Sequence, residues 1–215
     1  MATTRRVRAN PGQGVRLREE ILCAAEALLE ETGSEDALTL RAVASRAGVS
    51  TPSVYLHFAD KEALVEAVCL RVWDELARLM RETTGDDPFR AMGNCGRAYA
   101  RFALGHPTQY RVLMLRPSQG TPPAAAACFG YMVDAVTRCV EAGMLRGDPV
   151  PLALSLWSAV HGCVSLLITH PGLPWPEDLD GFIDDTIRMA GLGSALMSRL
   201  PRGSVPSDAW LSRPL

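Results

Sequence analysis

The side chains best suited to binding an anion lie close together in the sequence, between residues 55 and 61. Lys61, the only lysine in the chain, stands at the expected start of a helix, where its charge and the helix dipole both favour a phosphate group. Tyr55 offers a hydroxyl group, and His57 can donate a hydrogen bond even when neutral. The alternatives are that Tyr55 belongs to the core, that His57 is a satisfied structural histidine and that Lys61 is simply solvated.

Enzymatic chemistry finds little support in the sequence. There is no glycine-rich phosphate loop, nucleophile elbow or HExxH motif. The aspartates near residues 178–185 have no histidine close by in the sequence, and a solvated helix start explains them. The six cysteines show neither zinc-ligand nor CxxC spacing. We therefore expect no enzyme, no metal site and no cofactor.

The composition limits the kind of nucleic-acid contact that is possible. Lys and Arg total 22 against 24 Asp and Glu, for a net charge of -2, so a protein that coats nucleic acid over its whole surface is excluded. Aromatic residues make up only 6%, which disfavours a stacking platform for single strands. Because the first 18 residues lack the apolar stretch of a secretory signal, we expect a cytoplasmic protein with reduced thiols.

Apolar spacing predicts an all-α chain of about nine helices, and no segment alternates for long enough to form a strand. The helices are expected near residues 15–32, 40–47, 51–58, 61–82, 89–105, 107–115, 121–143, 150–170 and 179–199. Residues 1–14, with Arg5, Arg6 and Arg8, are interpreted as a flexible basic arm, and residues 201–215 as a loose tail.

Two short helices joined by a tight turn are predicted over residues 40–58. Thr39 and Ser50 are good helix N-caps, and Gly48 can take the positive φ that the turn requires. Ala44 is small enough to lie where the helices cross. This is the pattern of a helix-turn-helix, whose second helix can enter a DNA major groove. A generic αα-hairpin is the structural alternative.

With its flanks, this stretch resembles the tetracycline-repressor (TetR) family of bacterial transcription regulators. The resemblance covers about residues 15–68. It implies a homodimer that binds a palindromic operator and typically represses transcription, and that dissociates from the DNA when a small molecule enters its C-terminal bundle. The matching residues are Ile21, Ala25, Thr39, Val43, Ala44, Ala47, Gly48, Val49, Ser50, Val54, Tyr55, His57, Phe58, Lys61, Glu62, Ala63 and Leu64.

Individual roles follow from the resemblance by position. Thr51, Pro52 and Ser53 match residues that face bases, and Arg41 matches one that reaches a base edge or a phosphate. Tyr55, His57 and Lys61 match residues that hold the phosphate backbone. The full predicted DNA-binding set is Arg41, Ser50, Thr51, Pro52, Ser53, Tyr55, His57 and Lys61.

The expected recognition helix contains no Arg, Lys, Asn or Gln, the residues that make bidentate contacts with bases. Its hydroxyl groups should therefore read bases loosely. Sharper readout is expected from Arg41, or from the arm if its arginines enter the minor groove; an idle arm is the alternative.

The C-terminal part resembles a subset of the family marked by Trp-x-x-x-His-Gly, here Trp157, His161 and Gly162, and implies a bundle with an internal cavity. His106-Pro107 with Tyr110-Arg111 resembles the junction between its fifth and sixth helices. In the alternative interpretation, His161 is satisfied in the core and Trp157 only fills volume. The predicted ligand-binding residues are Phe102, Tyr110, Met114, Phe129, Met132, Trp157 and His161.

No charged residue occurs between Pro149 and Trp175, so a membrane span has to be weighed. Pro151 and Pro171 bracket the apolar run, and basic anchors are absent close to its ends, which favours a buried or subunit-interface helix. Pairing the eighth and ninth helices across a two-fold axis would cover it, so we expect a homodimer and no membrane contact.

We therefore expect a basic arm at residues 1–14, a helix-turn-helix DNA-binding domain at 15–62, a ligand-binding and dimerisation domain at 63–200 and a tail at 201–215. The predicted function is a cytoplasmic TetR-like repressor that a small apolar or amphipathic ligand releases from its double-stranded operator. The alternative is a helical ligand carrier or protein-interaction bundle whose helix-turn-helix no longer binds DNA.

Overall fold

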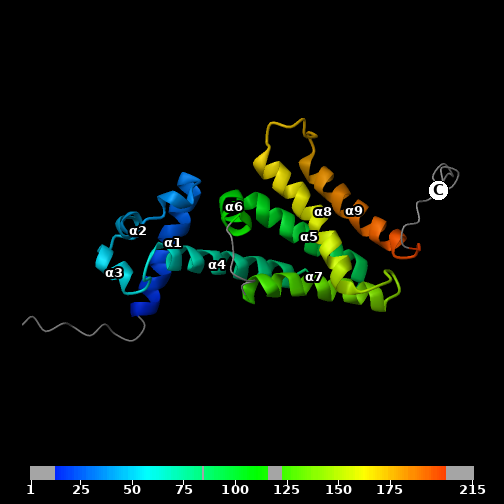
Figure 1. Ribbon diagram of the computed structural model, residues 1–215, viewed down its shortest axis with the longest axis horizontal. Coiled ribbons are helices and arrows are strands. Elements are labelled where there is room, and N and C mark those ends of the chain that lie inside the picture. The colour runs from blue at the N-terminus through cyan, green and yellow to red at the C-terminus, as the bar shows by residue number, and fades with distance from the viewer. Residues whose placement is uncertain (1–12, 84, 116–122, 202–215) are drawn as a thin grey trace, which may run out of the picture. The chain divides into compact units, whose positions relative to one another are not determined.

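The computed structural model describes residues 13–83, 85–115 and 123–201, and these residues contain helices and no strand (Figure 1). The nine α-helices expected from the sequence are confirmed within this part of the chain. They are α1 (Gln13–Thr32), α2 (Leu40–Arg46), α3 (Thr51–Tyr55), α4 (Lys61–Arg81), α5 (Pro88–Gly105), α6 (Pro107–Leu115), α7 (Pro123–Glu141), α8 (Pro149–Thr169) and α9 (Leu179–Met197).

Three details differ from the expectation. Helix α1 begins at Gln13, earlier than expected, and a short 3-10 helix, η1 (Glu35–Ala37), follows it. Helix α3 ends at Tyr55, after which the backbone N–H groups of residues 57 and 58 both donate to the carbonyl of Val54. The predicted arginines of the arm at positions 5, 6 and 8, and residues 202–215 of the tail, lie outside the described residues.

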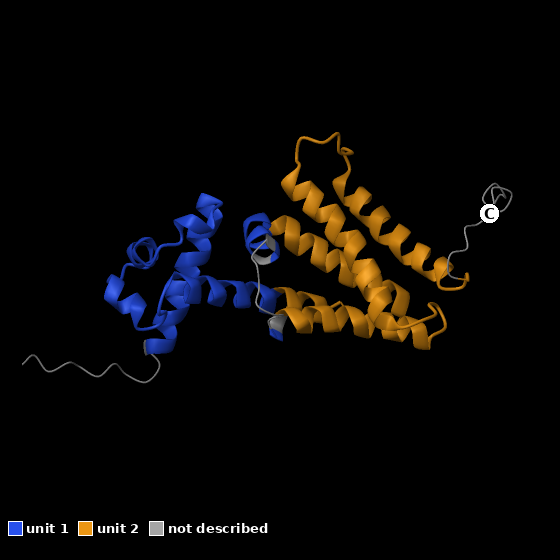
Figure 2. Ribbon diagram, viewed as in Figure 1, with its two compact units in different colours: residues 1–75, 106–124 blue, residues 76–105, 125–215 orange. Residues whose placement is uncertain are grey.

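The chain forms two compact units, coloured separately in Figure 2. Unit 1 comprises residues 1–75 and 106–124, and unit 2 comprises residues 76–105 and 125–215. The first part of α4 belongs to unit 1 and its last turns to unit 2. The domain boundaries proposed from the sequence stay a prediction.

The core of unit 1 is built from one apolar face of each helix. Ile21 and Leu29 on α1, Val43 on α2, Val54 on α3 and Leu64 on α4 are all fully buried. Their burial removes several large aliphatic side chains from water, at about 1.5–3 kcal/mol for each one. This core fixes the helix-turn-helix against α1 and α4.

Polar contacts add to the cohesion of unit 1. Arg71 on α4 reaches two carboxylates of α1, Glu19 at 2.7 Å and Glu26 at 2.9 Å. Burial raises the pKa of Glu26, and the positive charge of Arg71 only partly offsets that effect. On α6, Gln109 is buried and its Nε2 donates to Glu30 Oε1 at 2.6 Å, which ties α6 to α1.

Unit 2 is a helical bundle in which α9 packs against both α8 and α5. Val136, Ala153 and Val164 are fully buried among its helices. Three thiols, those of Cys95, Cys128 and Cys139, are also buried, and burial raises the pKa of Cys95 to about 12 and that of Cys139 to about 11. These cysteines therefore contribute as small apolar residues rather than as nucleophiles.

Candidate DNA-binding and ligand-binding sites

Each short helix of the helix-turn-helix begins at a side-chain N-cap. The Thr39 hydroxyl accepts from the backbone N–H of Ala42 at 3.1 Å, and the Ser50 hydroxyl accepts from that of Ser53 at 3.3 Å. Both residues have the extended backbone typical of an N-cap, as their position in the sequence predicted.

The turn between these helices depends on Gly48. Its φ of +70° lies in the left-handed region, which a glycine adopts without strain. This conformation lets the N–H of Val49 donate back to the carbonyl of Ala44 at 2.9 Å. Ala44 is buried, as expected for a small residue where two helices cross. The structure therefore contains the glycine turn and the small residue at the helix crossing that the sequence predicted.

The end of the helix-turn-helix packs against α1 through an aromatic side chain. Phe58 is buried directly after α3, and the guanidinium of Arg18 on α1 lies 5.1 Å from the centre of its ring. Such an arrangement is a cation–π contact. It fixes the end of the helix-turn-helix to the first helix of the unit.

The predicted DNA-binding residues lie on the exposed or half-buried surface of unit 1. Arg41, Ser50, Pro52 and Tyr55 are exposed, and Thr51, Ser53, His57 and Lys61 are half-buried. Tyr55 keeps 56% of its surface exposed, so the alternative that places it in the core is wrong. The structure thus places all eight side chains within reach of solvent, and their contact with DNA stays a prediction.

Some of these groups already have partners within the chain. The hydroxyl oxygens of Ser50 and Ser53 are 2.7 Å apart and share a hydrogen bond. Lys61 Nζ lies 3.8 Å from a carboxylate oxygen of Asp36, whose side chain is fully exposed. An ion pair this exposed contributes little to stability, so Lys61 can exchange it for a phosphate at little cost.

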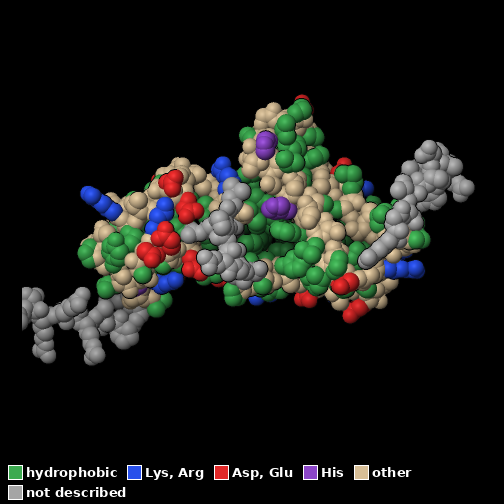
Figure 3. All heavy atoms as spheres, in the orientation of Figure 1, with side chains coloured by type: hydrophobic (Ala, Val, Ile, Leu, Met, Phe, Trp, Pro, Cys, Tyr) green, Lys and Arg blue, Asp and Glu red, His purple; other side chains and the backbone are tan. Residues whose placement is uncertain are grey.

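Charged side chains of both signs are mixed on the visible face of unit 1 (Figure 3). Arg46 on α2 makes two hydrogen bonds to Glu31, at 2.5 and 2.6 Å, which shows how closely the signs alternate. This mixture of signs agrees with the net charge of -2.

In unit 2, the Trp-x-x-x-His-Gly motif lies on α8. The ring centres of Trp157 and His161 are 4.9 Å apart, and His161 Nδ1 is 2.8 Å from the hydroxyl oxygen of Tyr99 on α5. Burial lowers the pKa of His161, which favours the neutral imidazole. The three side chains form a partly buried aromatic cluster with polar groups, which suits either ligand binding or core packing.

Tyr99 was not predicted as part of this cluster. It lies 62 residues from His161 in the sequence, so no local spacing links the two. The available signal was weaker: Cys95, Tyr99 and Phe102 share the buried stripe of α5. A polar hydroxyl on such a stripe requires a partner, and His161 supplies one.

The other predicted ligand-binding residues are divided between the two units. Phe102 and Met132 are buried in unit 2, where Phe129 is half-buried, whereas Tyr110 and Met114 lie on α6 in unit 1. A cavity of about 420 Å³ does lie within unit 2, but of the predicted set it is lined by Met132 alone. The predicted ligand-binding set stays a prediction.

Apolar side chains are exposed on both C-terminal helices. On α8 these are Val150, Leu154 and Leu166, each 44–46% exposed. On α9, Met189 and Leu192 are more than half exposed. Among the described residues, α8 is also the one helix long and apolar enough to cross a membrane, with a third of its most apolar window buried. Exposed apolar side chains that gather into a patch mark interaction sites, which makes these two helices candidates for one.

No group of three or more His, Cys, Asp or Glu side chains that could hold a metal ion occurs within the described segments. The six cysteines of these segments form no disulfide with one another, and Cys23 is exposed.

Two family descriptions match the chain. Residues 21–68 match "Bacterial regulatory proteins, tetR family", and residues 92–190 match "Tetracyclin repressor-like, C-terminal domain". A helix-turn-helix transcriptional regulator of Mycobacterium tuberculosis is 31% identical over 179 residues, which is 80% of this chain and 79% of that protein.

Solved structures agree with these matches. A protein from Rhodococcus sp. RHA1 superposes with a TM-score of 0.73 at 24% identity, covering 89% of this chain and all of that one. SmeT, the repressor of a Stenotrophomonas maltophilia multidrug efflux pump, superposes with a TM-score of 0.61 at 25% identity over 88% of this chain and 96% of SmeT. A SmeT–triclosan complex matches with a TM-score of 0.57, also at 25% identity, over 93% and 99% of the two chains.

Proposed function

The chain belongs to the TetR family of DNA-binding transcriptional regulators, and we propose that it is a cytoplasmic homodimeric repressor released from a palindromic operator by a small ligand. The observation that carries the proposal is the outward-facing helix-turn-helix. Its caps and its glycine turn are satisfied within the chain, while Arg41, Pro52 and Tyr55 remain exposed.

The chemistry of this surface suits a groove and its phosphates. Tyr55 and His57 can donate to phosphate oxygens, and Lys61 adds a charge at the start of α4. Apart from the buried Val54, the residues of α3 carry hydroxyl groups or the apolar ring of Pro52, so they supply fit rather than strong base discrimination. We assign the sharpest readout to Arg41, at the start of α2.

The exposed apolar side chains of α8 and α9 support dimerisation through these helices. A two-fold axis would place the same apolar surfaces against each other and remove them from water. Each subunit would then present one helix-turn-helix, which matches a palindromic operator. This arrangement also accounts for α8 without a membrane.

The effector is proposed to be a small apolar or amphipathic molecule bound near Trp157 and His161. The Tyr99–His161 hydrogen bond provides a polar anchor, and the indole ring of Trp157 provides an apolar wall. The triclosan complex of SmeT gives a precedent for such a ligand in a related fold. Release from DNA requires only that the ligand binds the DNA-incompetent state more tightly.

The decisive experiment measures binding of the full chain to the DNA upstream of its own gene across a salt series. We expect salt-sensitive binding by a dimer, and Lys61→Gln should lower the slope of log affinity against log salt by about two, one phosphate contact per subunit. Arg78→Gln, an exposed arginine at the other end of α4, is the matched control and should leave the slope unchanged.

Absence of duplex binding at low salt would reject the regulator and favour a ligand carrier or protein-interaction bundle. A monomeric chain in sedimentation, with DNA binding intact, would reject only the proposed dimer through α8 and α9.

A further inference from the structure

The cavity in unit 2 is a second, separate candidate for ligand binding. It has a volume of about 420 Å³, within the usual range for small-molecule sites, and lies between α5, α7, α8 and α9. Its apolar wall consists of Phe89, Met92, Met132, Leu156, Val160 and Ile187. Neither Trp157 nor His161 lines it, so it is distinct from the site proposed for the effector.

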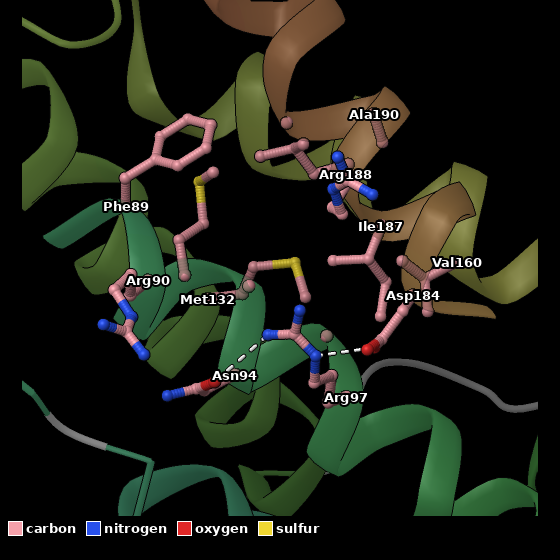
Figure 4. Close-up of a pocket in the computed structure, with 15 residues that line it drawn as sticks. Phe89, Arg90, Asn94, Arg97, Met132, Val160, Asp184, Ile187, Arg188 and Ala190 are labelled. Carbon is pink, nitrogen blue, oxygen red and sulfur yellow. Dashed lines mark hydrogen bonds and ion pairs between the residues drawn. The ribbon is translucent and has the colours of Figure 1, made fainter. Parts of the chain in front are cut away.

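The polar part of the wall is mainly cationic. Arg90, Arg97 and Arg188 line the cavity together with the carboxylate of Asp184 (Figure 4). Arg188 is paired with Asp185 at 2.8 Å, so the three arginines exceed these two carboxylates by one positive charge, that of Arg90. Arg97 is held between Asp184, at 2.6 Å, and the side-chain oxygen of Asn94, at 3.2 Å. The cavity wall therefore has an excess of positive charge beside its apolar surface.

Small residues keep the cavity open where α5 and α9 approach each other. A Cβ atom built on Gly96 would come within 3.5 Å of Ile187, and one built on Gly191 within 3.2 Å of Phe89. The contact at Gly191 is tighter than an ordinary Cβ contact, so a larger residue there would push against Phe89, whereas the contact at Gly96 is an ordinary one. Two methionines in the wall can adjust to different ligand shapes.

The cavity and the proposed dimer surface lie on different faces of α9. Positions 184, 187, 188 and 191 are four of the five α9 residues that line the cavity, and their spacing places these four on one helical stripe; the fifth is Ala190. The exposed apolar positions 189, 192 and 196 form another stripe, turned by roughly a third of the helix circumference. Dimerisation through the second stripe would leave the first available to a ligand.

We infer that this cavity binds an amphipathic organic anion, an aliphatic carboxylate whose chain lies against the apolar wall and whose head group is bound by Arg90 with Arg97. A guanidinium binds a carboxylate through two parallel hydrogen bonds, and burial of an aliphatic chain against the apolar wall stabilises the complex. The inference goes beyond the proposed function, since it concerns a site that the Trp157–His161 cluster does not include.

The test is calorimetric titration of the full chain with decanoate and decyltrimethylammonium, both below their micellar concentrations, and with decan-1-ol below its solubility limit. Decanoate should bind at least about tenfold more tightly than the alcohol, and the cation should bind weakest. Arg90→Gln should weaken decanoate binding about tenfold and leave the affinity for the alcohol unchanged. Arg101→Gln removes an exposed arginine of the same helix outside the cavity and should change neither.

A filling variant separates this cavity from the proposed effector site. Ala190→Trp places an indole in the cavity and should abolish decanoate binding, whereas Trp157→Ala should leave it intact. Because Arg90 is exposed, the Arg90→Gln comparison stands even if the filling variant does not fold. Equal affinities for decanoate and decan-1-ol, equal effects of the two arginine variants, or loss of binding in Trp157→Ala would each overturn the inference, and none of them affects the DNA-binding result.

Discussion

The contact between Gln109 and Glu30 allows a quantitative test of how α6 is attached to α1. Gln109 is 5% exposed; its Nε2 donates to Glu30 at 2.6 Å, while its Oε1 is the one buried side-chain polar atom without a partner among the described residues. Glu30 itself is about half exposed, with 54% of its side chain accessible. The two ends of this hydrogen bond therefore differ in how well water can replace the lost partner.

This asymmetry predicts unequal costs for the two substitutions. Glu30→Ala leaves the Gln109 amide buried with no partner, which should lower the free energy of unfolding by about 1–3 kcal/mol. Gln109→Leu keeps the volume, removes the unsatisfied oxygen and leaves a carboxylate that water can solvate. Its effect should stay within about 1 kcal/mol of zero.

Urea unfolding followed by circular dichroism, together with hydrogen exchange of the α1 and α6 amides, measures the effect globally and locally. Glu31→Ala is the matched control, since it removes an exposed carboxylate from the adjacent position and breaks a surface pair with Arg46 worth about 1 kcal/mol or less. If Gln109→Leu destabilises the protein more than Glu30→Ala, the reasoning from burial is refuted.

Further predictions follow from other parts of the structure. Arg41→Ala should cost more discrimination between operator variants than Ser53→Ala, by about 1–3 kcal/mol in mobility-shift titrations, and the reverse order would contradict the proposed readout. Cys23 is exposed, whereas burial raises the pKa of Cys95 to about 12, so Cys23→Ser should remove the fastest phase of thiol labelling and Cys95→Ser should not. Burial lowers the pKa of His161, so the unfolded chain binds more protons there and stability falls as pH drops through 6.5 towards the folded-state pKa. The loss of Tm between about pH 7 and pH 5 should therefore be smaller in His161→Gln, and an unchanged loss would exclude that contribution.

The parts of the fold that depend on neighbouring residues could be predicted from the sequence. Thr39, Ser50 and Gly48 act on backbone groups only a few positions away, so their types and spacing were enough to locate both short helices and the turn. The ends of the longer helices followed approximately from apolar spacing and from proline and glycine residues, although α1 begins at Gln13 and α9 ends at Met197, each about two residues earlier than expected.

Contacts between residues far apart in the chain could not be predicted from residue spacing. The hydrogen bond between Tyr99 and His161 depends on how α5 and α8 pack, and the cavity depends on α9 lying across the glycines of α5. The sequence indicated His161 but not its partner, and it placed the ligand-binding residues on helices that the structure divides between two units. Only tertiary packing decides such questions.

The assignment of α6 to unit 1 bears on how the protein can be divided experimentally. Unit 1 ends within α4 and resumes at α6, while α5 belongs to unit 2. The unit that contains the helix-turn-helix is therefore discontinuous in sequence. A fragment that stops at residue 75 would lack α6 and its hydrogen bond to Glu30. Chimaeras that exchange operator specificity with a relative should therefore carry α6 along with α1–α3 and the first part of α4, because an exchange of the N-terminal segment alone joins an α1 and an α6 that did not evolve together.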